Sequence, residues 1–203
     1  MEYLEIIDWK YFFLNEQNRN NYLTEIKKYI NENFEELNDQ PGAVRYNLNP
    51  IINSSYLNLF ILNHYVKDCL FNYFKSKSLF IKFIRYRNPL HLSGEQELHY
   101  DWIVNDVEKR IEMFILLDDM DKNNGSIVVM KNNRIKPISA KAGSCIIMES
   151  TTLHGGSKNK NGKSRAVIDI HIGVNPQSDE QSLIRITNTN NDNKKLVYNE
   201  NLD

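Results

Sequence analysis

The sequence is poor in cysteine, has no excess of either charge and contains no long apolar run, and each absence excludes a class of protein. Only Cys69 and Cys145 occur among the 203 residues, without the spacing of a metal site. We expect them to be buried free thiols in a reducing compartment. The 25 basic and 26 acidic residues give a net charge of −1. A broad nucleic-acid surface is therefore disfavoured, because phosphate binding needs a cationic excess.

Membrane and export signals are also lacking. No apolar run approaches the roughly 18 residues of a membrane-spanning helix, and the mean hydropathy is −0.54. The segment from Met1 to Glu5 has neither the basic region nor the apolar region of a signal peptide. We therefore expect a cytoplasmic protein without a membrane partner.

What is present is ordinary globular composition, with 41% hydrophobic and 25% charged residues. The length suits one domain with a core that needs no disulfides. We predict a single domain over 1–203, in three parts: a mainly helical part over 1–78, a jelly-roll core over 79–174 and a polar C-terminal extension over 175–203.

Apolar spacing predicts helices in the first part. One helix is expected over 15–38, ended by Gln40-Pro41-Gly42, because an apolar residue recurs every four positions at Tyr22, Ile26, Ile30 and Phe34. A second is expected over 54–75. His64 lies on its apolar stripe, where a core histidine is a better interpretation than a metal ligand.

From Leu79 onward, the sequence consists mainly of short strand-like runs. Strand-like runs cover 79–87, 110–117, 126–130, 144–148 and 165–174, with turn signals between the later ones, and 183–186 could add an edge strand. No βαβ alternation occurs. The pattern predicts a mainly β protein with helices, built on a double-stranded β-helix, or jelly roll, with the N-terminal helices packed on one sheet.

Two histidines and one aspartate form the candidate metal site. His99 and Asp101 are two apart, so on a strand both face the same side. His154 follows a predicted strand and precedes Gly155-Gly156, where backbone could pass close to a ligand. Two histidines with one carboxylate are typical of non-haem Fe(II) oxygenases. His-x-Asp alone is a weak signal.

Arg165 strengthens this interpretation, because it lies 11 residues after His154 and opens a predicted strand. A buried arginine offers a planar fork to a carboxylate. A 2-oxoglutarate cosubstrate chelates iron through its 1-carboxylate and keto oxygen, so its far carboxylate needs such an anchor.

The segment from about Phe80 to Gly173 resembles the phytanoyl-CoA dioxygenase family of Fe(II)/2-oxoglutarate oxygenases. The landmarks occur in the family's order: Arg85-Tyr-Arg-Asn-Pro89, Ser93-Gly94, His99-Tyr100-Asp101-Trp102, Leu116-Leu117-Asp118, Asn124-Gly125, Gly143-Ser144, His154-Gly155 and Arg165. One departure is Gly156, which stands where the family often has a small hydroxylic residue.

The resemblance implies that His99, Asp101 and His154 bind Fe(II), that Arg165 and Tyr86 contact 2-oxoglutarate, and that O₂ is the second cosubstrate. It implies oxidation of a small-molecule substrate, with succinate and CO₂ as coproducts. Asp101 is replaced by a small residue in halogenating relatives. Its retention here favours hydroxylation.

Strand parity extends the set of candidates. If Arg165 points inward, Val167, Asp169 and His171 do too, as rim residues or as contacts to a polar substrate. An inward Tyr86 would turn Arg85 and Arg87 to a solvated face. Glu97 would share a face with His99 and Asp101, at the entrance.

Two other functions stay open. The chain could be a metal-binding jelly-roll module without turnover, although such a module has no need of Arg165. It could instead oxidise a protein or a carrier-tethered substrate. Neither the substrate nor the oligomeric state follows from the sequence.

Overall fold

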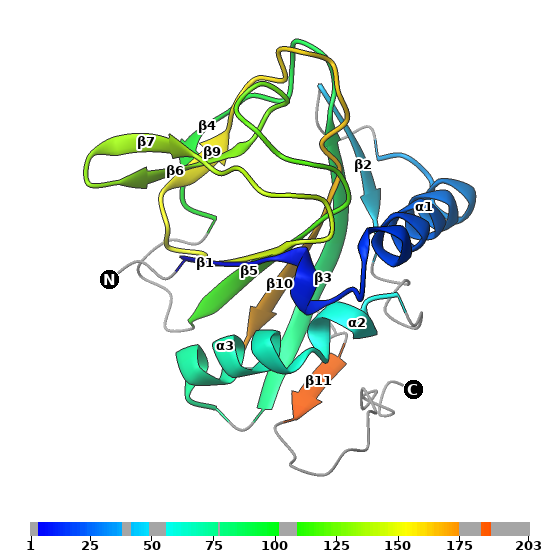
Figure 1. Cartoon of the computed structure of the whole chain (residues 1–203). Helices are drawn as coiled ribbons and strands as arrows, with labels where there is room; N and C mark the ends of the chain where they lie inside the picture. Colours follow the sequence, from blue (N-terminus) through cyan, green and yellow to red (C-terminus); the bar gives the residue numbers. More distant parts are fainter. Residues whose placement is uncertain are drawn as a thin grey trace.

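Two antiparallel sheets form the protein, and helices cover one of them from outside (Figure 1). The computed structural model describes residues 4–37, 42–48, 56–76, 78–101, 109–174 and 184–187, the last range for its backbone only. The expected turn at Gln40-Pro41, the start of the second predicted helix, Trp102 and most of the predicted C-terminal extension lie outside these ranges. No helix within them is long and apolar enough to span a bilayer.

The larger sheet has the strand order β1-β8-β5-β10-β3-β11, with β2 also paired to β3. Its strands are β1 (Leu4–Ile7), β2 (Ala43–Asn47), β3 (Ser78–Pro89), β5 (Arg110–Leu116), β8 (Cys145–Glu149), β10 (Val167–Gly173) and β11 (Ile184–Thr187). The predicted edge strand is confirmed as β11. The first part was expected to be mainly helical, yet it contributes β1 and β2 to this sheet.

The smaller sheet has the order β4-β9-β6-β7. Its strands are β4 (Gln96–His99), β6 (Ile127–Lys131), β7 (Arg134–Pro137) and β9 (His154–Gly156). The expected strand geometry before His99 corresponds to β4, but β4 ends at His99 and does not include Asp101. β9 is too short to give a period-two signal, so the sequence did not predict it. These two strands nevertheless carry both histidines of the candidate metal site.

The helices form where local signals begin and end them. In α1 (Glu16–Asn33), the side chain of Asn15 accepts a hydrogen bond from the backbone of Asn18 at 2.9 Å. The second predicted helix is broken into α2 (Asn58–Ile61) and α3 (His64–Phe74), because Asn63 caps a new start. His64 is exposed at that start, so it is not a core residue.

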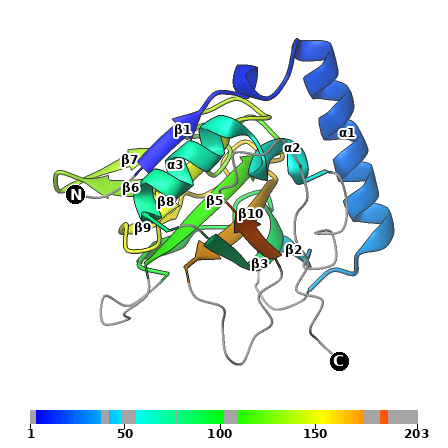
Figure 2. The ribbon, with the colours of Figure 1, turned by 90° about the horizontal axis from the view of Figure 1, so that it is seen from below.

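Apolar residues divide into two clusters, one on each face of the larger sheet. The outer cluster joins helix residues such as Ile26, Phe60 and Leu70 to the outward side chains of β3, β5 and β10. Figure 2 shows α3 lying across this sheet. The inner cluster fills part of the space between the sheets. The prediction of a mainly β protein with helices on one sheet is therefore confirmed.

Candidate metal centre and cofactor pocket

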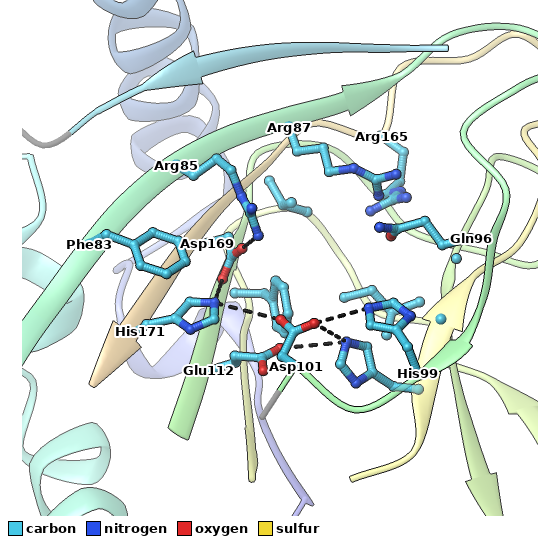
Figure 3. Close-up of a pocket in the computed structure, with 16 residues that line it drawn as sticks. Phe83, Arg85, Arg87, Gln96, His99, Asp101, Glu112, Arg165, Asp169 and His171 are labelled. Carbon is cyan, nitrogen blue, oxygen red and sulfur yellow. Dashed lines mark hydrogen bonds and ion pairs between the residues drawn. The ribbon is translucent and has the colours of Figure 1, made fainter. Parts of the chain in front are cut away.

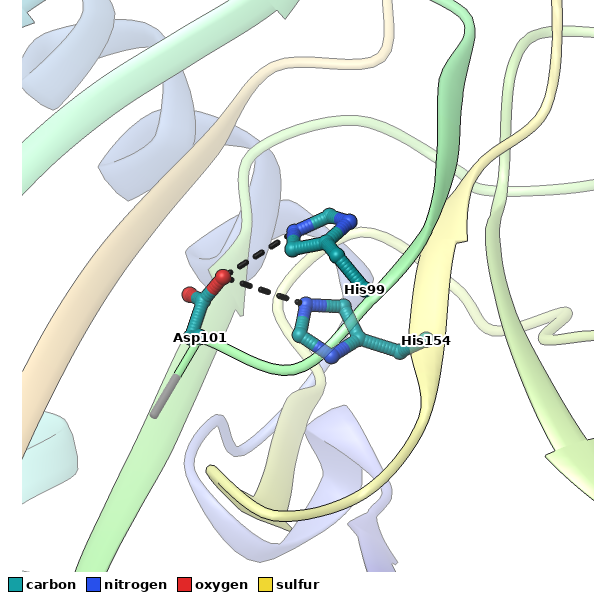
Figure 4. Close-up of side chains that lie close together, drawn as sticks. All are labelled: His99, Asp101 and His154. Atoms are coloured by element: carbon teal, nitrogen blue, oxygen red, sulfur yellow. Dashed lines mark ion pairs between the residues drawn. The ribbon is translucent and has the colours of Figure 1, made fainter. Parts of the chain in front are cut away.

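His99 and His154 are brought together by the ladder between β4 and β9. They are directly paired in register, and their ring centroids are 4.6 Å apart. Asp101 follows the end of β4 by two residues and turns back toward both rings (Figure 4). Its Oδ1 lies 3.0 Å from His99 Nε2 and 3.9 Å from His154 Nε2. The structure thus places the three predicted ligand residues around one point.

Backbone carbonyls hold both imidazoles by the nitrogen that faces away from that point. His99 Nδ1 lies 2.7 Å from the carbonyl oxygen of Glu97, and His154 Nδ1 lies 2.9 Å from that of Thr152. An Nδ1 proton donated to these carbonyls leaves Nε2 free to bind a metal. Burial has the largest effect on the pKa of His154 and lowers it. The lower pKa favours the neutral imidazole, which is the form that binds a metal.

The fit to a divalent metal follows from this arrangement. One ligand atom from each of His99, Asp101 and His154 lies within 4.8 Å of the other two. Two neutral imidazoles and one carboxylate on one side of an ion suit Fe(II) and leave coordination positions open toward the cavity.

A cavity of about 290 Å³ extends from the three ligands between the two sheets. Figure 3 shows Arg87, Arg165 and Gln96 at one end, and Phe83, Asp169 and His171 at the other. In the same view His99 lies near Gln96, and Asp101 lies beside Glu112. The remaining lining residues are Arg85, Glu112, Phe114, Ile127, Gly155, Gly156 and Val167.

Arg165 lies two residues before β10 and is held there by its neighbours. Its backbone nitrogen donates to Asn88 Oδ1 at 3.0 Å. The backbone N–H of the next residue, Ala166, donates a hydrogen bond to Asp118 Oδ2 at 3.1 Å. Asp118 is also ion-paired with Lys27 of α1. The first helix therefore supports the backbone that presents the Arg165 side chain.

The guanidinium of Arg165 lacks an anion. The residue is 1% exposed, and its Nε and Nη2 have no hydrogen-bond partner among the described residues. Burial, followed by the charge of Arg87, lowers the pKa of Arg165 to about 9. Burial and neighbouring arginines likewise lower the pKa of Arg87 to about 10. An anion bound between them would relieve both effects.

The expectation that Tyr86 faces the cavity is wrong. Arg85 and Arg87 line the cavity, and Tyr86 packs into the outer cluster with its ring 5.1 Å from that of Tyr46. Arg85 and Arg87 therefore do not form a solvated face. The error is one of strand parity: Ile84 and Tyr86 alternate with Arg85 and Arg87, and the apolar pair packs into the outer cluster while the arginines line a polar cavity.

Val167, Asp169 and His171 do line the cavity, as the parity of Arg165 predicted. Burial alone would raise the pKa of Asp169, but His171 and Arg85 outweigh it and hold that pKa below its ordinary value. The corresponding expectation for Glu97 fails. Glu97 is exposed and Gln96 lines the cavity, because the β4–β9 register shifts between Gln96 and His99.

Sequence analysis missed Glu112 of β5, which is fully buried in the cavity wall. Burial, followed by the charges of Asp101 and Asp169, raises its pKa well above the ordinary range. Its Oε2 lies 3.6 Å from His154 Nε2. The available signal was one acid within an otherwise apolar strand, Arg-Ile-Glu-Met-Phe-Ile-Leu.

Gly155 permits the close contact of the two metal-binding strands. A Cβ on Gly155 would lie 2.7 Å from the carbonyl oxygen of Gln96 and 3.0 Å from that of Glu97. Both atoms belong to the backbone of β4, which could yield only by moving His99. The glycine after His154 is therefore required by packing.

The fold resembles that of solved enzymes, although no family model and no curated protein sequence matches the chain. HygX from Streptomyces hygroscopicus, solved with nickel, 2-oxoglutarate and hygromycin B, superposes with a TM-score of 0.66 at 10% identity over 84% of this chain and 82% of its own. The carbocyclase SnoK from nogalamycin biosynthesis gives 0.64 at 10% identity over 85% and 79%. The epimerase SnoN of the same biosynthesis gives 0.63 at 9% identity over 84% and 77%. These likenesses confirm that the chain has the predicted jelly-roll fold.

Proposed function

We propose that the chain is a non-haem Fe(II)/2-oxoglutarate-dependent dioxygenase that hydroxylates a small molecule. The observation that carries this proposal is the buried guanidinium of Arg165, whose Nε and Nη2 have no partner among the described residues, in the same cavity as His99, Asp101 and His154. A metal alone would not need it. A metal with a chelating dicarboxylate would.

The residues of the cavity match the charges of Fe(II) and of 2-oxoglutarate. His99, Asp101 and His154 would hold Fe(II), and Arg165 would bind the far carboxylate of 2-oxoglutarate through its planar fork. Arg87 adds a second positive charge at that end of the cavity. When bound, iron and 2-oxoglutarate together with O₂ supply the oxidative decarboxylation that yields succinate and CO₂ and oxidises a substrate C–H bond.

The protein's own part is to orient these groups and to exclude water. The two backbone carbonyls fix the imidazole tautomers of His99 and His154. Walls from both sheets surround the reacting groups, which strengthens each electrostatic contact within the cavity.

The structural neighbours support a small-molecule substrate. HygX was solved with hygromycin B and SnoN with nogalamycin RO, each together with 2-oxoglutarate or alpha ketoglutarate. SnoN is an epimerase and SnoK is a carbocyclase, so this fold hosts several reaction outcomes. We propose hydroxylation because Asp101 is retained. The same proposal includes three further points: the chain is a member of the phytanoyl-CoA dioxygenase family, it forms a single domain over 1–203, and it is located in the cytoplasm.

Anaerobic titration with Fe(II) and 2-oxoglutarate, followed by succinate assay with O₂ and a panel of amino acids, lipids and sugars, tests the proposal. We expect one Fe(II) and one 2-oxoglutarate per chain, and succinate release stimulated by one class of the panel. Binding without succinate release under any condition would instead support a metal-binding module. A chain that binds neither group would contradict the proposal outright.

A further inference from the structure

Gln96 places a side-chain amide beside the two arginines at one end of the cavity, and the proposed function gives this amide no role. Gln96 lines the cavity together with Arg87 and Arg165. Figure 3 shows the head groups of these three residues gathered at the same end. Arg87 lies on β3 and Arg165 precedes β10, whereas Gln96 begins β4 of the smaller sheet. The amide therefore approaches the guanidinium groups from the opposite sheet.

Gly156 of β9 makes room for this amide. Gln96 and Gly156 are directly paired in register, and both line the cavity. A Cβ on Gly156 would lie 3.4 Å from Gln96 Oε1 and 3.1 Å from the carbonyl oxygen of Gly94. The head group of Gln96 thus lies over the position from which a larger residue at 156 would extend. The lack of a side chain there lets Gln96 reach the arginines.

Gly94 connects the positions of Arg87 and Gln96. Arg87 Nη2 donates a hydrogen bond to the carbonyl oxygen of Gly94 at 3.4 Å, two residues before Gln96. Gly94 has a φ of +76°, and a Cβ on it would lie 2.3 Å from the Cβ of Pro89. Only glycine permits this close approach between the end of β3 and the start of β4. The same tight connection therefore positions both Arg87 and Gln96.

The amide leaves the charge of the arginines unanswered, whereas an acid would neutralise it. Elsewhere in the cavity Arg85 is ion-paired with Asp169. By contrast, Nε and Nη2 of Arg165 and Nε of Arg87 have no hydrogen-bond partner among the described residues. Gln96 has the size of a glutamate but carries no charge. Both guanidinium groups therefore stay available to an anionic ligand.

We propose that the side-chain amide of Gln96 donates a hydrogen bond to the far carboxylate of 2-oxoglutarate and that its neutrality makes the cavity selective for a dianionic keto acid. This inference rests on the proposed function and adds a specificity-determining residue to it. The amide nitrogen donates hydrogen bonds without adding charge, and the amide oxygen accepts them. Gln96 thus adds a donor for the carboxylate without competing with it for Arg165.

Contact with the substrate is the competing role for Gln96. A substrate needs an entrance, and the lining residues Phe83 and Arg85 are only half-buried, whereas Arg165 is 1% exposed. Figure 3 shows Phe83 at the end of the cavity away from Gln96. The burial of the arginine end thus suits a cosubstrate that every turnover requires, and the more exposed end suits the substrate.

The binding of two keto acids to the full chain loaded with Mn(II) tests the proposal. 2-Oxoglutarate and 2-oxopentanoate share the group that chelates a metal, and only 2-oxoglutarate has the far carboxylate. Each is titrated separately, and the relaxation rate of water protons at Mn(II) reports its binding. The ratio of the two dissociation constants measures the contribution of the far carboxylate.

The unaltered chain should prefer 2-oxoglutarate. Gln96→Ala should lower that preference about tenfold, as for one hydrogen bond to a charged group. Gln96→Glu should abolish it, because the introduced carboxylate would pair with Arg165 as Asp169 pairs with Arg85. The affinity for 2-oxopentanoate should be the same in all these proteins. Glu95→Gln, at the exposed neighbouring position, is the control and should keep the full preference.

The other outcomes separate this inference from the proposed function. An unchanged preference in both Gln96 variants overturns the role of the amide and leaves the proposed function intact. Equal weakening of both keto acids also overturns it, because Gln96 would then only support the strand that carries His99. An unaltered chain that binds Mn(II) without preferring 2-oxoglutarate contradicts the proposed function itself. Circular dichroism identifies a variant that does not fold, and the other Gln96 variant then decides.

Discussion

His99 and His154 are directly opposite one another on β4 and β9, so the pairing of two short strands creates the side of the cavity that carries the proposed metal ligands. Their Nε2 atoms converge on Asp101 because each Nδ1 is held by the carbonyl of the residue two positions earlier. Backbone geometry in the smaller sheet therefore largely determines where the two imidazoles of the proposed metal site converge.

Replacing either His99 or His154 with alanine should weaken Fe(II) binding by more than about tenfold. Loss of a residue that only hydrogen-bonds to a metal ligand already weakens metal binding by about that much. Isothermal titration with Mn(II) or Fe(II) measures the affinity, and circular dichroism checks that the fold is retained. His64→Ala is the matched control, because His64 is exposed on α3. Unchanged metal affinity in both variants would contradict the assignment of the ligands.

Arg165→Lys should raise the KM for 2-oxoglutarate about tenfold or more, because lysine is a point charge without the planar fork. The loss corresponds to roughly 1.5–3 kcal/mol for a charge-assisted hydrogen bond. Metal affinity should hardly change. Arg134→Lys, at an exposed position of β7, should leave both values as they are. If Arg165→Lys also leaves the KM unchanged, the anchor is elsewhere, and Arg87 is the next candidate.

Asp101→Ala should abolish coupled hydroxylation and succinate release, because two imidazoles hold Fe(II) poorly. The change also removes one negative charge and opens a coordination position, so chloride could bind there. Simultaneous assay of succinate and oxidised substrate is the measurement. Asp68→Ala on the exposed side of α3 serves as the control. Full activity of the Asp101 variant would remove this residue from the ligand set.

Gly155→Ala should destabilise the protein and weaken metal binding together, because its Cβ would press on the β4 backbone that carries His99. Gly156→Ala is the milder comparison, since its Cβ would come no closer than 3.1 Å to another atom. The temperature of thermal unfolding and the affinity for Mn(II) should both be highest in the unaltered protein, lower in Gly156→Ala and lowest in Gly155→Ala. The reverse order would show that the β4–β9 contact does not limit the site.

The sequence was informative where the chemistry is local and poor where it depends on pairing. His99 and Asp101 were found because their spacing occurs among the landmarks of a known family, and Asp169 and His171 followed from the parity of Arg165. Tyr86 was misplaced because the cavity is lined by the charged face of β3, with Arg85 and Arg87, rather than by its apolar face. Glu97 was misplaced because a register shift follows Gln96. Glu112 was missed because its place in the cavity wall depends on what faces β5, which no local pattern contains.

Cys145 should resist thiol reagents until the protein unfolds. It is fully buried on β8, and burial raises the pKa of its thiol. Cys69 is only half-buried, which differs from the expectation that both thiols are buried, and should be labelled first. Mass spectrometry after iodoacetamide treatment, with and without denaturant, measures both sites. Rapid labelling of Cys145 in the native protein would contradict its position in the core.

The two sheets carry different ends of the proposed cofactor site, since His99 and His154 belong to the smaller sheet and Arg165 leads into the larger one. Apolar side chains of the inner cluster, including Phe114, Ile127, Val129 and Val167, hold the sheets at a fixed separation. Close-packed interiors resist compression, so this separation is stiff. A keto diacid one carbon shorter or longer than 2-oxoglutarate would therefore span it poorly. Discrimination by chain length is thus a property of the packing between the sheets rather than of the residues that touch the diacid.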